Sequence, residues 1–173
     1  MLYSRFGVLS ILFIYLFQIP VSFSSEKKAI GWLEHVEIAD SDFQLKAKID
    51  TGATTSSLNA KIIKKFSKNG DKWIRFQIEN KTGDKVLLER KLVRYVKIKR
   101  KLAFALKRPV IKLGICLGQV YRTMEINLAD RKNFNYQVLI GRNYLRDYFL
   151  VDSALRYTTK PLCKEHNYND NQD

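Results

Sequence analysis

The chain of 173 residues has few of the side chains that bind metal ions or form disulfides. Its histidines are His35 and His166, and its cysteines are Cys116 and Cys163. A zinc site needs about three nitrogen, sulfur or oxygen ligands at a workable spacing, and neither HExxH nor CxxC occurs in this sequence. We therefore expect no metal. The cysteines leave two alternatives open, a single disulfide or two buried thiols.

A nucleotide-binding loop is also missing. The GxxxxGK[ST] pattern surrounds phosphates with backbone N–H groups, a lysine and a hydroxyl. The segment 114–119 reads Gly-Ile-Cys-Leu-Gly-Gln, with no lysine, serine or threonine where the pattern requires them. We expect no ATP site and no other cofactor.

Acidic residues are scarce relative to basic ones, with 17 Asp and Glu against 31 Lys and Arg and a formal charge of +14. Such an excess favours acidic substrates, anionic surfaces or nucleic acid as partners. A well-solvated basic surface without a partner is the alternative. The export signal described next argues against nucleic acid, which we do not expect as a partner.

The N-terminal 24 residues have a targeting pattern. Arg5 precedes an apolar run from Phe6 to Phe17, and Pro20 and small serines follow. A short basic start, an apolar run of about a dozen residues and a small-residue exit indicate a signal peptide. An uncleaved anchor is the alternative, although the run is short for a bilayer-spanning helix. We expect a periplasmic or secreted protein with no stable membrane span after signal removal.

The chain between Gly31 and Thr159 shows the pattern of short strands. Apolar stretches are separated by turn sequences such as Asn69-Gly70-Asp71 and Thr82-Gly83-Asp84. This spacing favours a closed or partly closed β-barrel. The expected strands are Lys72–Ile78, Val86–Leu88, Leu92–Ile98, Val110–Leu113 and Tyr121–Leu128. A short helix is expected at Arg142–Tyr148, after Gly141, and residues 162–173 are expected to form a polar tail.

One motif places a carboxylate at the end of a strand. The half-buried segment Leu45–Ile49 runs into Asp50-Thr51-Gly52 and then Ala53. Gly52 lets the backbone turn sharply and expose its N–H close to the carboxylate. The Thr51 hydroxyl both donates and accepts hydrogen bonds, which suits a tightly packed loop. An ordinary strand-to-turn junction is the alternative, because Asp and Gly are common turn residues.

A second motif comes late in the chain. Three apolar residues, Val138–Ile140, lead into Gly141-Arg142-Asn143. Together with Asp50-Thr51-Gly52-Ala53, and in the same order, this segment resembles the catalytic and supporting loops of retroviral aspartic proteases. The resemblance implies a mostly β, retropepsin-like closed six-stranded barrel over residues 25–161, with Asp50 as the catalytic carboxylate.

A closer resemblance covers nearly the whole mature chain. Gly31–Glu34, Lys46–Ala60, Trp73–Phe76 and the later runs Asn127–Arg131, Leu139–Arg142 and Phe149–Asp152 are similar to a bacterial retropepsin-like family once labelled ATP-dependent zinc proteases. The missing zinc and ATP motifs disagree with that label. Some members are associated with enzymes that add glutamates to ribosomal protein tails.

The chemistry of this family requires two carboxylates, and the sequence has one Asp-Thr-Gly. Asp152 faintly echoes the motif, but Ala154 stands where glycine belongs. It also follows Gly141 too closely for a second lobe, so we interpret Val151 and its neighbours as a closing strand. The second carboxylate is then Asp50 of another copy, in a two-fold homodimer.

The basic hairpin from Val96 to Ile111 is the expected flap over the site, with Lys99, Lys107 and Arg108 among its cations. An exposed charged hairpin is the alternative. A basic flap would suit an acidic peptide or protein substrate. Retroviral proteases also pair the arginine after glycine with an acidic residue, and Thr54 stands at that position here. Arg142 must therefore bind another group, such as Asp130 or a backbone carbonyl.

Three functions remain open from the sequence. The favoured one is an aspartic endopeptidase acting through Asp50. The second is a catalytically inactive module on the same fold that binds an anionic peptide or glycan. The third is a basic protein that binds membranes or cell-envelope polymers. Fold alone does not decide among them.

Overall fold

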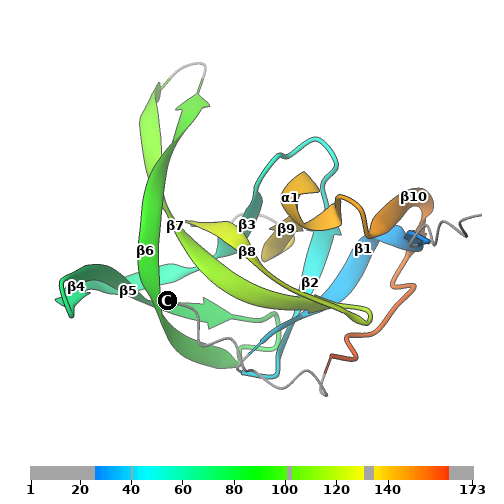
Figure 1. Ribbon diagram of the computed structural model, residues 1–173, viewed down its shortest axis with the longest axis horizontal. Helices are drawn as coiled ribbons and strands as arrows, with labels where there is room; N and C mark the ends of the chain where they lie inside the picture. The colour runs from blue at the N-terminus through cyan, green and yellow to red at the C-terminus, as the bar shows by residue number, and fades with distance from the viewer. Residues whose placement is uncertain (1–25, 40, 101–102, 131–134, 164–173) are drawn as a thin grey trace, which may run out of the picture.

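The computed structural model describes residues 26–163 except 40, 101–102 and 131–134 (Figure 1). The expected signal peptide at residues 1–24 lies outside this part, and so do residues 164–173 of the polar tail expected over 162–173. Among the described residues, no helix has the length and apolar character needed to cross a membrane.

Strands dominate the described chain, which confirms the mostly β fold with one short helix directly after Gly141. The elements are β1 (Lys28–Ile38), β2 (Phe43–Ile49), β3 (Ser56–Asn59), β4 (Lys61–Lys68), β5 (Asp71–Glu79), β6 (Lys85–Arg100), β7 (Ala103–Leu117), β8 (Val120–Ala129), β9 (Val138–Ile140), α1 (Arg142–Leu145) and β10 (Phe149–Arg156). The helix begins at the predicted residue but is shorter than expected. Asp147, with φ of +73°, adopts a left-handed conformation that a continuing helix does not allow.

The strands are arranged in the order β10-β1-β2-β9-β3-β8-β7-β6-β5-β4 (Figure 1). An additional pairing joins β1 to β7, with Glu37 opposite Cys116 and Ile38 opposite Ile115. The pairings of β1, β2, β9, β3, β8 and β7 therefore form a ring. Strands β10 and β4 lie at the two ends of the order, outside this ring.

Alternation along the strands explains where the core lies. On β2, Leu45, Ala47 and Ile49 are buried while Lys46 and Lys48 are exposed. On β5, Ile74, Phe76 and Ile78 are buried in the same way, so every second residue of these strands faces the core. The turn before β5 uses Asn69 and Gly70, both with positive φ, as expected of a tight hairpin.

The C-terminal part of the chain packs on β1. Strand β10 contains the expected strand around Val151 and pairs in parallel with β1. A Cβ placed on Gly31 would lie 2.4 Å from the Leu155 carbonyl oxygen, so only glycine fits at this approach. Beyond β10, the Tyr157 N–H donates to the Leu33 carbonyl oxygen at 2.7 Å.

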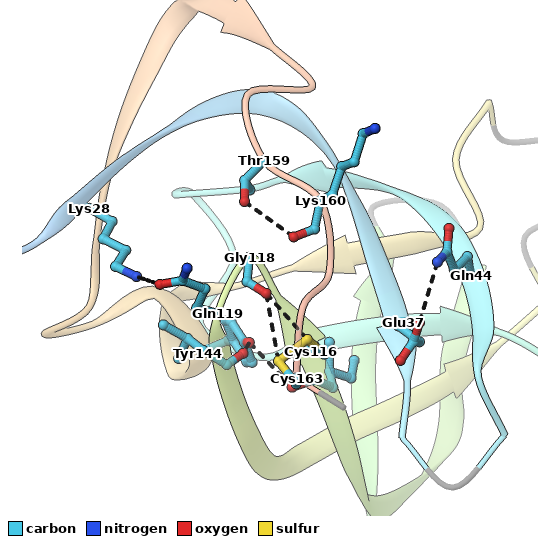
Figure 2. The surroundings of a disulfide bond; sticks show 12 residues. Lys28, Glu37, Gln44, Cys116, Gly118, Gln119, Tyr144, Thr159, Lys160 and Cys163 are labelled. Atoms are coloured by element: carbon cyan, nitrogen blue, oxygen red, sulfur yellow. Dashed lines mark hydrogen bonds between the residues drawn. A yellow bond between two sulfur atoms is a disulfide. The ribbon is translucent and has the colours of Figure 1, made fainter. Parts of the chain in front are cut away.

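A disulfide joins Cys116 on β7 to Cys163, with a Cα–Cα distance of 5.9 Å. Of the two alternatives left open by the sequence, the structure has the bonded one. Figure 2 shows Cys163 beside the turn that connects β7 to β8. The Leu162 N–H also donates to the Gly118 carbonyl oxygen at 2.7 Å in that turn. The segment after β10 is thereby fixed to β7.

The side chain of Glu34 is fully buried and holds the same segment from the other side. Its Oε1 accepts the Gly31 N–H at 2.7 Å and both the N–H and the hydroxyl of Thr158, at 3.0 and 2.5 Å. Its Oε2 accepts the Thr159 N–H at 3.2 Å. A buried carboxylate is tolerated here because several donors replace its hydration.

Candidate active site

Asp50 stands at the end of β2, where the neighbouring strand β9 also ends. The two strands are parallel, with Ala47 opposite Val138 and Ile49 opposite Ile140. The Asp50 N–H donates to the Ile140 carbonyl oxygen at 2.8 Å, which continues the ladder through the aspartate itself. The half-buried carboxylate is thus held at the edge of a rigid sheet, as its sequence position predicts.

The loop after β2 directs two backbone donors at the carboxylate. The N–H groups of Gly52 and Ala53 donate to Asp50 Oδ1 at 3.1 and 3.2 Å. A Cβ on Gly52 would lie 3.3 Å from the same oxygen, so a larger residue would crowd the carboxylate. Within the described chain these donors both meet Oδ1, and Oδ2 stays open for a proton or a water molecule.

Arg142 holds the other side of the same two peptide groups. Its Nη1 donates to the carbonyl oxygens of Thr51 and Gly52 at 2.7 and 3.0 Å, and its Nη2 donates to Thr54 Oγ1 at 2.9 Å. Because a peptide group is planar, binding each carbonyl on one side directs the following N–H to the other side, where Asp50 lies. Of the two expected partner types, Arg142 uses the backbone carbonyl, and Thr54 replaces the acidic residue.

Gly141 allows the supporting segment to lie directly behind this loop. A Cβ at Gly141 would sit 2.9 Å from the Thr55 carbonyl carbon and 3.0 Å from the Ala53 carbonyl oxygen. The Arg142 N–H donates to Ala53 O at 2.9 Å, and the Asn143 N–H donates to Thr54 O at 3.0 Å. The structure therefore brings the two predicted motifs together.

Asn143 and the buried Ser56 connect the two loops through side chains. Ser56 Oγ accepts the Gly141 N–H at 3.0 Å and donates to Asn143 Oδ1 at 2.9 Å. Asn143 Nδ2 donates to the Glu125 carbonyl oxygen at 2.8 Å. Asn127 Nδ2 donates to the Ser56 carbonyl oxygen at 2.8 Å.

Sequence reasoning missed Ser56 and Asn127 as supports of the site. The run of small polar residues after Ala53 was the available signal for Ser56. Asn127 gave no local signal, because it reaches the loop only through the parallel pairing of β3 with β8.

The expected flap lies on the hairpin of β6 and β7, the tall arm in Figure 1. Val96 pairs with Arg108 and Lys97 with Lys107. Arg108 Nη1 donates to Asn127 Oδ1 at 3.3 Å, which links the base of the arm to the residues behind Asp50. Lys107 is exposed, and the side chain of Lys99 lies outside the described part. The role of this hairpin as a flap stays a prediction.

Asp152 was considered from the sequence because it faintly echoes the Asp50 motif. It lies exposed on β10, and its Oδ1 accepts the Ala154 N–H at 2.8 Å.

Within the described residues, no three His, Cys, Asp or Glu side chains gather closely enough to hold a metal ion. A hollow of about 720 Å³ is lined by Asn59, Asp130 and Gln137, near the opposite end of β9 from Asp50. Asp50 does not line this hollow.

A family model described as RimB-like, the retropepsin-like aspartic endopeptidase RimB, matches residues 29–161. A solved structure of the Legionella pneumophila protein Lpg0085, of unknown function (DUF785), is 38% identical with a TM-score of 0.69. The alignment covers 78% of this chain and 100% of that one. These matches agree with the resemblance found in the sequence.

Longer relatives carry a different description. A probable alpha-L-glutamate ligase of Desulfotalea psychrophila is 28% identical over 80% of this chain and 31% of its own length. One of Shewanella pealeana is 34% identical over 64% of this chain and 25% of its own length. The chain thus spans less than a third of these curated relatives.

Proposed function

The chain belongs to the RimB-like family of retropepsin-like aspartic endopeptidases, and on that premise we propose that it is an aspartic peptidase that acts through Asp50. One observation carries the proposal. Two consecutive peptide groups give their N–H groups to Asp50 Oδ1 and their carbonyl oxygens to Arg142. This fixes the carboxylate and leaves Oδ2 open, as a proton-transferring group requires. The ring of strand pairings supports the closed six-stranded barrel of a retropepsin.

The proposed reaction uses two Asp50 carboxyl groups that share one proton, because like charges a few Å apart do not both ionise readily. The ionised carboxylate takes a proton from a water molecule, whose oxygen attacks the scissile carbonyl carbon. The protonated carboxyl donates its proton to the carbonyl oxygen. When the C–N bond breaks, the protonated carboxyl gives its proton to the leaving nitrogen. The other carboxylate takes a proton from a hydroxyl of the tetrahedral intermediate, which becomes the carboxylic acid product, so the pair again shares one proton.

The proposal requires a homodimer, because one chain supplies one Asp-Thr-Gly. Two Asp50 side chains meet only if the two-fold axis passes beside this loop. Thr51 and Gly52 are exposed in the single chain, so this loop is accessible to a second copy.

The proposed substrate is an acidic peptide or protein segment. The formal charge of +14 supports an anionic partner. The description of longer relatives as glutamate ligases is consistent with a substrate rich in glutamate. Ligation is not proposed for this chain, since it spans less than a third of those relatives and has no phosphate-binding loop motif.

We place the protein in the periplasm or outside the cell. The apolar pattern of the first 24 residues supports export. The Cys116–Cys163 disulfide supports an oxidising compartment, because such bonds are rare in the reducing cytosol.

Residues 25–173 incubated with a diverse peptide library between about pH 4 and pH 7 would test the peptidase. Asp50→Asn serves as the inactive variant and Asp152→Asn as the matched control, with products identified by mass spectrometry. We expect cleavage by the wild type and by Asp152→Asn, and none by Asp50→Asn. Sedimentation should show a dimer in all three.

Cuts that persist in Asp50→Asn would refute the mechanism. A folded dimer that cleaves nothing would favour the alternative, a binding module for anionic peptides or glycans. Binding by such a module would be the same in Asp50→Asn.

A further inference from the structure

Strand β4 is an edge strand: it lies at one end of the strand order and, among the described strands, pairs only with β5. Figure 1 shows it at the tip of an arm directed away from α1. Of its eight residues seven are exposed and one, Phe66, is half-buried. Its outer edge therefore presents backbone N–H and C=O groups that another strand can bind.

The charge of this strand is entirely positive. It carries four lysines and no acidic residue: Lys61, Lys64, Lys65 and Lys68, here called the β4 lysines. Lys61 and Lys64 stand opposite Gln77 and Arg75, whereas Lys65 stands opposite the buried Ile74. Because the side chains of facing residues share one side of a sheet, the β4 lysines occupy both faces.

The neighbouring carboxylates are already engaged with other cations. Asp71 pairs with Lys91, Glu79 with Lys85, and Glu89 with Arg75. Within the described chain, no β4 lysine forms an ion pair. Lys65 and Lys68 instead lie over the rings of Tyr95 and Trp73, at 5.3 and 5.0 Å from the ring centroids. The excess positive charge at this edge is uncompensated.

We propose that the β4 edge binds an extended acidic polypeptide segment, which adds to the sheet as a further strand. Main-chain hydrogen bonds would supply affinity and the lysines would supply specificity. Since cations lie on both faces, the partner needs carboxylates at consecutive positions rather than at alternate ones. A second copy of β4 is a poor occupant, because pairing two such edges would bring eight lysines together.

The edge is a docking surface separate from the catalytic loop. This proposal adds to the proposed function the place where an acidic partner is held. It rests on the proposed peptidase activity only where it predicts an effect on catalysis. Binding itself does not need Asp50, so the two proposals fail separately.

Binding can be measured by fluorescence anisotropy in the Asp50→Asn background. The probe is a labelled eight-residue peptide of mixed aspartate and glutamate, and a second probe has N-methyl groups on alternate amides. The test variant changes all four β4 lysines to glutamine. The control variant removes the same charge from exposed positions elsewhere: Lys27→Gln, Lys112→Gln, Arg146→Gln and Lys160→Gln.

We expect the β4 variant to weaken binding by roughly tenfold to a hundredfold, as the loss of four exposed ion pairs would do, and the control by much less. The N-methylated probe should bind the parent protein as weakly as the plain probe binds the β4 variant. Equal losses in the β4 and control variants would overturn the proposal in favour of general charge attraction. Equal binding of the two probes would overturn strand addition.

A further outcome would identify a purely protective role. If the β4 variant self-associates while binding the acidic probe as the control does, the lysines serve only to prevent edge-to-edge pairing, and the proposal is wrong. In the active enzyme, the β4 variant should raise KM for substrates with an acidic segment and leave kcat unchanged.

Discussion

The two ends of the strand order differ in what holds them. At the β10 end, the chain is fixed by buried and covalent contacts: the close approach of Gly31 to Leu155, the carboxylate of Glu34 and the Cys116–Cys163 disulfide. The β4 end has exposed lysines and surface ion pairs instead of buried and covalent contacts. Buried contacts stabilise far more than exposed ones, so we infer that the β10 end contributes stability and the β4 end contributes charge for a partner.

Removing the disulfide at the β10 end should lower the free energy of unfolding more than any substitution at the β4 end. The bond closes a loop between residues separated by 47 positions. Cys116→Ser with Cys163→Ser should lower the free energy of unfolding by about 3–4 kcal/mol, because the unfolded chain regains that loop's entropy. Urea denaturation measures the change, and the β4 variant is the control, with a change of about 0.5 kcal/mol or less. Equal losses in both would contradict the difference between the ends.

Glu34→Gln should have the next largest effect and lower the free energy of unfolding by about 2 kcal/mol. The substitution replaces one carboxylate oxygen with an amide NH₂ group, which cannot accept the hydrogen bond from the Thr159 N–H. Glu37→Gln is the matched control, since Glu37 is also buried, and its Oε2 accepts a hydrogen bond from the Gln44 side chain at 3.3 Å. Thermal unfolding of both variants measures the difference. Equal losses would show that burial, rather than the donors around Glu34, sets its contribution.

The ion pair between Arg75 and Glu89 on β5 and β6 should contribute much less. The Arg75 side chain is exposed and that of Glu89 is half-buried, so both are partly solvated. A double-mutant cycle with Arg75→Ala and Glu89→Ala should therefore give a coupling energy of about 0.5 kcal/mol. The coupling should fall further as salt is added. A coupling energy as large as the stability lost in Glu34→Gln would contradict the inference that the β10 end contributes more stability than the β4 end.

The smallest effect concerns the turn between β5 and β6. Hydrogen bonds from the side chains of Thr82 and Asn80 hold the pKa of the Asp84 carboxyl below its usual value. Stability from these bonds is present above the usual carboxyl pKa and is lost as pH falls through the lowered value. Thr82→Val should raise the pKa of Asp84 in an NMR titration, whereas Thr82→Ser should preserve it. An unchanged value in Thr82→Val would exclude the hydroxyl as the cause.

The two loop motifs were predictable because each residue type has a local reason. Gly52 and Gly141 stand where the backbone approaches other groups closely, and Asp50 stands where a strand ends. The partner of Arg142 was predictable only as a class, because its carbonyls come from a loop about ninety positions away in the chain. Glu34 was missed, because three of its four donors belong to Thr158 and Thr159, beyond β10.

The sequence by itself determined the strand-rich fold, the position of the Asp50 carboxylate and the excess of positive charge. These follow from alternation along strands, from glycine geometry and from composition, which are local or additive properties. The tertiary structure alone decided which residues meet: the bonded cysteines, the four donors on Glu34, the carbonyls on Arg142 and the exposed position of β4. Such contacts depend on the order and register of distant strands, which no short stretch of sequence specifies.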